Sequence, residues 1–270
     1  MANEVAVVNK FDIVTGYEDM DAELLEELQD EMEDLDEVKG ISCKKIKIPS
    51  GGGIAFEVET DDPESPDSIK ELEAVVIFTH RINSYWAESF GGSDNKAPDC
   101  SSFDSKKGVV FDTGEIRDCD TCPYNEYGEN GTGKPCKNMR RMYLLLSGKP
   151  GVYLLIVPPT SIKEVNNQLA RLMGGSKIPY SRMVLKFKLT KDKNKNGIVY
   201  SKVGIERVGM LPQEYFKTTA AMRKELKEKY KEVVITSDDY TTAPADPVVD
   251  KEGFMDVDAA GDIPEELPFN

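Results

Sequence analysis

The sequence predicts a mainly β protein of the α+β type. Short apolar runs rich in Val, Ile, Leu and aromatic residues recur between turns that contain Gly and Pro, which is typical of strands. Only a few segments have helical periodicity. Nothing in the 270 residues approaches the run of about 18 apolar residues that a membrane span needs. We therefore expect a protein that is not embedded in a membrane.

The chain begins with an acidic segment that we expect to be helical. Residues 17–38 contain strong helix formers and neither Gly nor Pro, and their apolar residues fall on one stripe. Residues 1–39 hold 14 acids and 2 bases, a net charge of −12. We assign 1–39 to an N-terminal arm that packs on the body, docks a partner or competes for a basic surface.

Strands and two helices are expected in the body of the chain, residues 40–237. The expected strands cover residues 41–48, 54–59, 72–86, 141–147, 152–159, 182–190 and 198–208. The expected helices cover 162–173 and 213–231. A helix before the final hairpin is what an OB-fold requires, because that five-stranded barrel has its helix between strands three and four. The order therefore predicts an OB-like antiparallel β-barrel with flanking helices, and an α+β sandwich is the alternative.

Four of the five cysteines lie between the third and fourth expected strands. Cys119 and Cys122 form a C-x-x-C pair, with eighteen residues between Cys100 and Cys119 and thirteen between Cys122 and Cys136. The intervening residues are mostly small and polar, so this stretch has little apolar surface with which to fold. Four thiolates around one structural Zn²⁺ would supply that stability. We predict a zinc-binding insertion at about 95–140.

Other uses of the cysteines are disulfides or unrelated roles. The first residues, MANEVAVVNK, lack a basic start and a long apolar core, so we expect no signal peptide and a reducing cytoplasmic location, which argues against disulfides. A catalytic zinc needs an open position that four cysteines do not leave. His80, the only histidine, could replace one cysteine, but we interpret it as structural. Cys43 is interpreted as a core residue.

Charge is distributed unevenly along the chain. Residues 238–270 hold 10 acids and 1 base, a net of −9, whereas 137–237 hold 21 bases and 7 acids, a net of +14. A basic body with aromatic residues suits unpaired nucleic acid, because bases neutralise phosphates and aromatic rings stack on exposed nucleobases. We predict nucleic-acid contacts from Tyr85, Trp86, Arg140, Arg141, Arg182, Lys186, Lys188, Lys193, Tyr200 and Lys202.

Neither an enzyme nor a reader of duplex sequence is indicated. The basic stretch 137–237 holds only 7 acids, no metal-binding carboxylate cluster is recognisable, and no nucleophile motif surrounds a serine. Helix-turn-helix and finger spacings are missing as well. We predict no enzymatic activity. The alternative to nucleic-acid binding is a zinc-ribbon adaptor or transcription regulator that acts through protein contacts.

The C-terminal residues 238–270 are acidic and aperiodic, so we expect a disordered tail. Its end resembles the tip of bacterial single-stranded DNA-binding proteins, an acidic stretch that closes in Asp-Ile-Pro-Phe. The matching residues are Asp262, Ile263 and Pro264, then Pro268 and Phe269. Glu265, Glu266 and Leu267 separate the two parts, and Asn270 follows the Phe.

The cysteine segment extends this resemblance. Cys119-Asp-Thr-Cys-Pro-Tyr-Asn, with Gly131, Gly133, Cys136 and Asn138 further on, is similar to single-stranded DNA-binding proteins of phages and mobile elements. The likeness covers roughly residues 95–237 and the tail. It implies an OB-fold core with a structural zinc. It also implies that the protein coats and protects unpaired DNA during replication or recombination. It also implies that the tail, including Leu267, recruits replication and recombination proteins and competes with DNA for the binding groove.

Overall fold

The structure is a computed structural model that describes residues 10–14, 27, 31, 43–62, 64–87, 97–128, 133–194, 197–233 and 235. Most of the acidic arm expected over 1–39 lies outside these ranges, and so does the whole tail expected over 238–270. The tail residues Asp262, Ile263, Pro264, Leu267, Pro268 and Phe269 are therefore outside the described residues. The arm, the tail and the boundaries drawn for them stay predictions.

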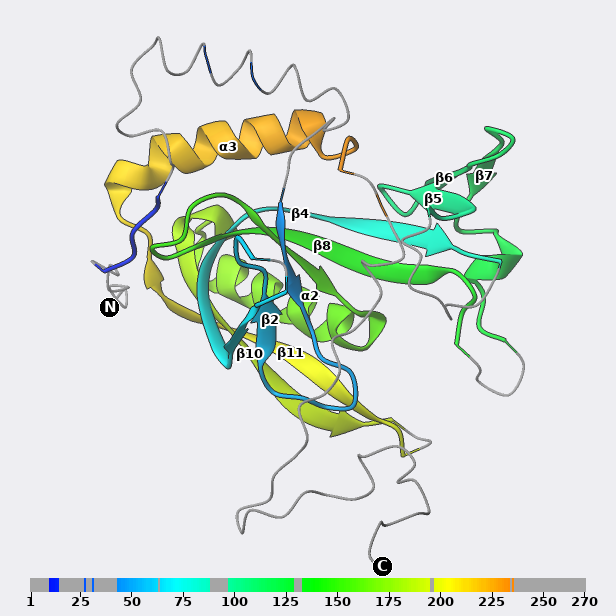
Figure 1. Ribbon diagram of the computed structural model, residues 1–270, viewed down its shortest axis with the longest axis horizontal. Coiled ribbons are helices and arrows are strands. Elements are labelled where there is room, and N and C mark those ends of the chain that lie inside the picture. The colour runs from blue at the N-terminus through cyan, green and yellow to red at the C-terminus, as the bar shows by residue number, and fades with distance from the viewer. Residues whose placement is uncertain are drawn as a thin grey trace, which may run out of the picture.

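Five long strands form the centre of the fold (Figure 1). They pair antiparallel in the spatial order β9, β8, β4, β10 and β11. Their bounds are β4 (Glu71–Tyr85), β8 (Lys137–Leu146), β9 (Tyr153–Val157), β10 (Met183–Lys193) and β11 (Val199–Met210). All five coincide with expected strands, which confirms a mainly β fold. β8 begins earlier than expected because its polar first residues also pair with β4.

Three short strands extend this sheet beyond β9. They are β1 (Lys44–Lys47), β2 (Phe56–Val58) and β3 (Asp67–Ile69). The strands expected at 41–48 and 54–59 are present as β1 and β2, which pair antiparallel, but β1 pairs with β9 in parallel. The sheet is therefore mixed, and the expectation of antiparallel pairing throughout is wrong at this pair.

The turn after β1 contacts β11, the last strand of the central group. The Ser201 hydroxyl of β11 lies 2.8 Å from the carbonyl oxygens of both Pro49 and Gly53 and can donate to either. In the described part of the chain, however, no strand pairing joins β11 to β1 or β2. The sheet is open in its backbone hydrogen bonding, so closure into a barrel stays a prediction.

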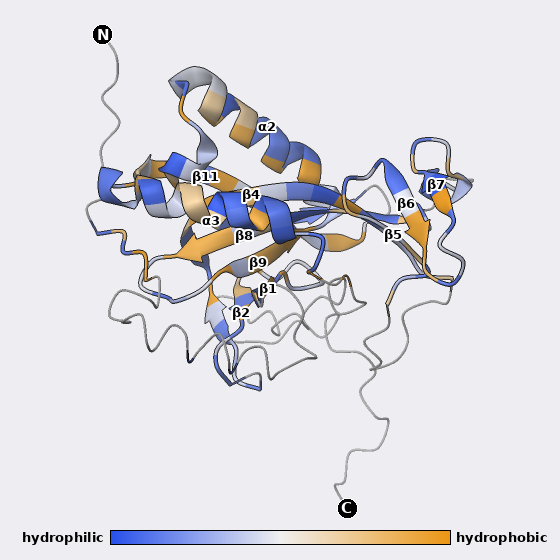
Figure 2. Cartoon of the chain, turned by 90° about the horizontal axis from the view of Figure 1, so that it is seen from above, coloured by the Kyte–Doolittle hydropathy of each residue, from blue (hydrophilic) through white to orange (hydrophobic). Residues whose placement is uncertain are grey.

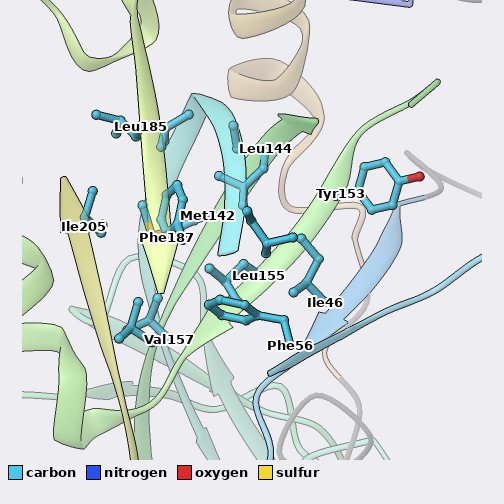
Figure 3. Close-up of a cluster of buried hydrophobic side chains, with 14 of the residues drawn as sticks. Ile46, Phe56, Met142, Leu144, Tyr153, Leu155, Val157, Leu185, Phe187 and Ile205 are labelled. Carbon is cyan, nitrogen blue, oxygen red and sulfur yellow. The ribbon is translucent and has the colours of Figure 1, made fainter. Parts of the chain in front are cut away.

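The centre of β4 is buried on both faces, as its continuous apolar run predicts. Ala74 and Val76 point into one core and Val75 and Ile77 into another. In Figure 3, side chains of the first core from β1, β2, β8, β9, β10 and β11 point toward one another. Burying each large apolar side chain contributes about 1.5–3 kcal/mol.

Two long helices cover these cores, α2 (Pro159–Ser176) and α3 (Phe216–Lys229). Val165 and Leu169 of α2 belong to the first core, and Leu226 of α3 belongs to the second. α2 continues past residue 173, where we expected it to end, through Gly174 and Gly175 to Ser176, and the capping residue Lys177 has a φ of 59°. Neither these helices nor any other described helix is long and apolar enough to cross a membrane.

The segment between β4 and β8 extends the same sheet by three short strands, which lie beside the ends of β4 and β8 in Figure 1. It contains β5 (Cys100–Ser102), β6 (Lys107–Val110), β7 (Ile116–Asp118) and the 3-10 helix η1 (Pro123–Asn125). β5 pairs with the last residues of β4, and β6 and β7 continue outward from β5. Two further 3-10 helices, η3 (Tyr180–Arg182) and η4 (Gln213–Tyr215), precede β10 and α3. We call residues 97–136 the cysteine insert.

Candidate functional site

The cysteine insert brings four thiols to one cavity. Cys100, Cys119, Cys122 and Cys136 all line a cavity of about 20 Å³, which has room for a single water-sized group. They are the first residue of β5, the residue after β7, the residue before η1 and the residue before β8. The grouping that we predicted from spacing alone is therefore present as a shared cavity lining.

Backbone hydrogen bonds fix the turn that carries the C-x-x-C pair. The Asn125 amide donates to the Cys122 carbonyl at 2.9 Å, and the Asn125 side-chain amide donates to the Cys119 carbonyl at 2.6 Å. The Cys136 amide donates to the Tyr124 carbonyl at 2.7 Å. These bonds hold three of the four cysteines next to η1, although that segment has little apolar surface.

Gly108 of β6 leaves room for the sulfur atoms. A Cβ at this position would lie 2.9 Å from the Cys100 Sγ and 3.7 Å from the Cys119 Sγ. Both sulfurs therefore approach the same point above the glycine, and a larger residue would displace Cys100.

Burial raises the pKa values of three of these thiols, and neighbouring thiols add to the effect. Burial raises the pKa of Cys136 to about 12, and the charges of Cys119, Cys122 and Cys100 add to the effect. Burial also raises the pKa values of Cys100 and Cys119, with neighbouring cysteines contributing. Zn²⁺ is bound by thiolates, so an ion in this cavity would have to lower these pKa values and displace the thiol protons.

The zinc site nonetheless stays a prediction. All five cysteines are free thiols. In the described ranges, no three His, Cys, Asp or Glu side chains are close enough together to hold an ion as they stand.

Cys43 and His80 lie away from this cavity. Cys43 packs against the second core, and burial raises its pKa to about 12. His80 Nδ1 lies 2.9 Å from the Phe103 carbonyl oxygen, and burial lowers the pKa of His80 to about 4. Both residues have the structural surroundings that we expected.

On β10 and β11, the lysines that we expected to contact nucleic acid have acidic neighbours. Lys186 lies 3.0 Å from Glu71, Lys188 lies 3.2 Å from Glu206, and Lys202 lies 3.2 Å from Asp192. Tyr200 bonds to the same Asp192. Lys193 is exposed at the tip of the hairpin. The outer face of these strands is a ladder of alternating charges rather than a basic strip.

The expected arginines have three different environments. The Arg182 guanidinium stacks 4.2 Å from the Phe216 ring centroid. Arg141 is fully buried and donates to the Val233 carbonyl at 2.8 Å. It therefore cannot contact a nucleic acid in this conformation. Arg140 is half-buried on the opposite face of β8. Of the three, Arg140 has the surroundings that best suit an external anion.

The expected aromatic residues Tyr85, at the end of β4, and Trp86, just after it, have different contacts. Tyr85 stacks on Tyr124 of η1, with centroids 4.2 Å apart and an interplanar angle of 17°, and it lines the cysteine cavity. Trp86 packs against the small core of Ile82 and Met139. Tyr85 therefore belongs to the insert, whereas Trp86 is partly a packing residue.

Sequence reasoning missed three residues of this region. Arg81 is exposed and stands directly opposite Arg140. Tyr124 and Tyr127 of the insert are 38% and 74% exposed. The Tyr residues follow the C-x-x-C pair and could have been singled out for that reason. Arg81 could not, because its neighbour on β8 is far away in the chain.

Comparison with protein-family models, curated proteins and solved structures finds no match for this chain.

Proposed function

We propose that this chain binds single-stranded DNA without sequence specificity and that its cysteine insert holds one structural Zn²⁺. In this proposal the protein coats and protects unpaired DNA during replication or recombination, and the acidic tail recruits partner proteins. Cys100, Cys119, Cys122 and Cys136 would hold the ion, whose role is to stabilise the insert.

The order of the five long strands supports an OB-like body. β4, β8 and β9 pair in sequence, α2 follows β9, and β10 returns to pair with β4 before β11 completes the hairpin. In OB-folds, the loop after the first strand and the loop between the last two strands border the surface that binds oligonucleotides. The corresponding loops here are the cysteine insert and the turn after Lys193.

The observation that carries the proposal is the exposed aromatic surface of the insert. Tyr127 is 74% exposed with the Lys134 ammonium 5.1 Å from its ring centroid, and the Tyr85–Tyr124 pair lies on the neighbouring turn. Exposed rings beside cations bind unpaired bases by stacking, at about 1–3 kcal/mol per base. Such contacts do not depend on which base is present.

A titration of fluorescent oligo(dT) at several salt concentrations tests this function. We expect tight, salt-sensitive binding that is stronger for single-stranded DNA than for duplex DNA. Tyr127→Ala should weaken it by about 5- to 100-fold, whereas Tyr127→Phe, which keeps the ring, should not. The proposal is wrong if the parent protein shows no preference for the single strand, or if both variants bind like the parent.

One observation favours the alternative function of a protein adaptor. Val109, Phe111 and Ile116 of the β6–β7 region are 49%, 73% and 69% exposed, and Val109 pairs with Ile116 across the hairpin. Figure 2 shows apolar colouring on these strands. If oligo(dT) does not bind, this apolar hairpin becomes the favoured functional surface.

A further inference from the structure

Two arginines face each other across the centre of the extended β4–β8 ribbon. Arg81 of β4 and Arg140 of β8 are directly opposite in the antiparallel register. Like charges in this position repel and destabilise a sheet unless something between them compensates. Burial lowers the pKa of Arg140, and the charge of Arg81 lowers it further.

Arg140 is held in place but incompletely hydrogen-bonded. Its Nη1 donates to the Thr79 hydroxyl at 3.0 Å, and that hydroxyl donates onward to the Arg141 carbonyl at 2.8 Å. Its Nε is buried and has no hydrogen-bond partner in the described structure. A buried donor without an acceptor is uncommon and costly, so this atom calls for an explanation.

Arg81 also differs from the lysines on β10 and β11. Lys186, Lys188 and Lys202 each have a carboxylate within 3.2 Å. Arg81 is exposed, and within the described ranges its guanidinium has no carboxylate partner. The pair therefore concentrates two positive charges on one strand face and lacks the counter-charge that neutralises the β10–β11 hairpin.

The same face continues toward the stacked tyrosines. Asn83 and Tyr85 follow Arg81 at alternate positions of β4, so their side chains point to the same side. Asn83 accepts hydrogen bonds from Ser105 at 2.8 Å and from Asn138 at 2.7 Å. These bonds connect the β4–β8 pair to the cysteine insert. Tyr85 lies about 13 Å along β4 from Arg81.

We propose that Arg81 and Arg140 together bind a backbone phosphate of the single strand, whose adjoining bases extend toward the Tyr85–Tyr124 stack. This inference rests on the proposed function and adds the position of its main phosphate contact. A phosphate oxygen between the two guanidinium groups neutralises the repulsion between the pair, and it accepts from the buried Arg140 Nε only when that side chain turns outward. Arginine suits this task because its planar fork can donate two parallel hydrogen bonds to one phosphate.

The first experiment compares arginine variants in oligo(dT) titrations over a range of salt. Arg81→Gln should bind roughly three- to tenfold more weakly and should reduce the slope of log K against log salt by about 1. Arg81→Lys should recover the slope but only part of the affinity, because lysine cannot donate bidentately. The matched control is Arg171→Gln, a charge loss on the exposed side of α2.

The second experiment follows the Arg140 Nε–H resonance by NMR while inorganic pyrophosphate is added to the whole protein. We expect this resonance to shift in the parent and to shift less in Arg81→Gln. This measurement needs neither DNA nor a variant at the half-buried Arg140 itself.

The outcomes separate this inference from the proposed function. If oligo(dT) binds and Arg81→Gln behaves like Arg171→Gln, the arginine site is wrong and the function stands. If oligo(dT) does not bind but pyrophosphate shifts the Arg140 resonance in an Arg81-dependent way, the site binds anions and the function is wrong. If neither ligand has an effect, both proposals are wrong.

Discussion

Arg223 of α3 supports an irregular point of the longest strand. β4 has a bulge at Ile77, where the register with β8 shifts between Val76 and Phe78. On the other edge of β4, β10 pairs only with its first residues and β5 only with its last. The Arg223 Nη1 donates to the Ile77 carbonyl at 2.6 Å and lies 2.6 Å from the Tyr180 hydroxyl. It thereby satisfies a carbonyl beside which the described residues place no strand on this edge of β4.

Replacing Arg223 with Ala should lower the free energy of unfolding by about 1–3 kcal/mol, because the Ile77 carbonyl is left without this partner. Urea unfolding followed by circular dichroism measures the change. Lys224→Ala, an exposed neighbour on α3, is the control and should change it by less than about 0.5 kcal/mol. Equal effects of the two substitutions would mean that the contact is not stabilising.

His80 should make folding stability depend on pH. Its folded-state pKa of about 4 lies below the ordinary value of 6.5, so between these values the unfolded chain binds a proton that the folded chain does not. The stability from the neutral ring is complete above about pH 6.5 and is lost as the pH falls toward 4, by at most about 3 kcal/mol.

Unfolding free energies at several pH values between 7 and 4 test this, with His80→Phe as the comparison. The variant keeps a ring that can stack on Phe78 and Tyr143 as His80 does, and it cannot titrate. Its stability should fall less than that of the parent over this range. Parallel curves for the two proteins would assign the pH dependence to other groups.

At the scale of elements, the cysteine insert was the most predictable part of the chain. The spacing of the four cysteines predicted that they would lie near one another, and all four line one cavity, whereas the zinc ion stays a prediction. The sequence could not show that Gly108 makes room for the sulfurs, or that Tyr85 and Tyr124 would stack. Those features depend on how β4, β5 and β6 pair.

Cys122→Ser should abolish zinc binding by the purified protein and destabilise the insert. We expect one Zn²⁺ per chain in the parent by metal analysis, and much less than one in the variant. Cys43→Ala is the matched control, since Cys43 packs in the second core, and it should retain the metal. A metal-free parent, or the same zinc content in the parent and Cys122→Ser, would contradict the proposed zinc site.

The hairpin of β10 and β11 illustrates what an alternating pattern can and cannot predict. Leu185, Phe187 and Leu189 alternate with the lysines in the sequence, and the structure places these three apolar residues in the first core and the lysines on the other face. The pattern could not reveal the acids beside those lysines, because Glu71 belongs to β4 and Glu206 is brought to Lys188 only by the hairpin register. On this face, which we expected to be basic, Lys186 and Lys188 therefore each form an ion pair with an acid.

For the whole molecule, the dominant feature is the separation of charge along the chain. Residues 137–237 carry a net charge of +14, and residues 238–270 carry −9. A polyanionic segment joined to a basic body competes with DNA for the same cations, most strongly when salt does not screen the attraction.

Removal of residues 238–270 should therefore tighten oligo(dT) binding at low salt, with the difference shrinking as salt is raised. Anisotropy titrations compare the truncated and full-length chains. The control keeps a tail of the same length with its acids replaced by Asn and Gln, and it should bind like the truncated chain. If the full-length chain binds as tightly as both, the tail does not compete for the DNA site.

The continuity of β4 limits how the molecule can be divided. Its first residues pair with β10, its last pair with β5, and β8 runs beside nearly its whole length. An excised peptide holding only residues 97–136 would lose the strand on which its own small sheet is assembled. The thiol-bearing part is therefore not a transplantable unit, and grafting it elsewhere would require the ends of β4 and β8 to be carried with it.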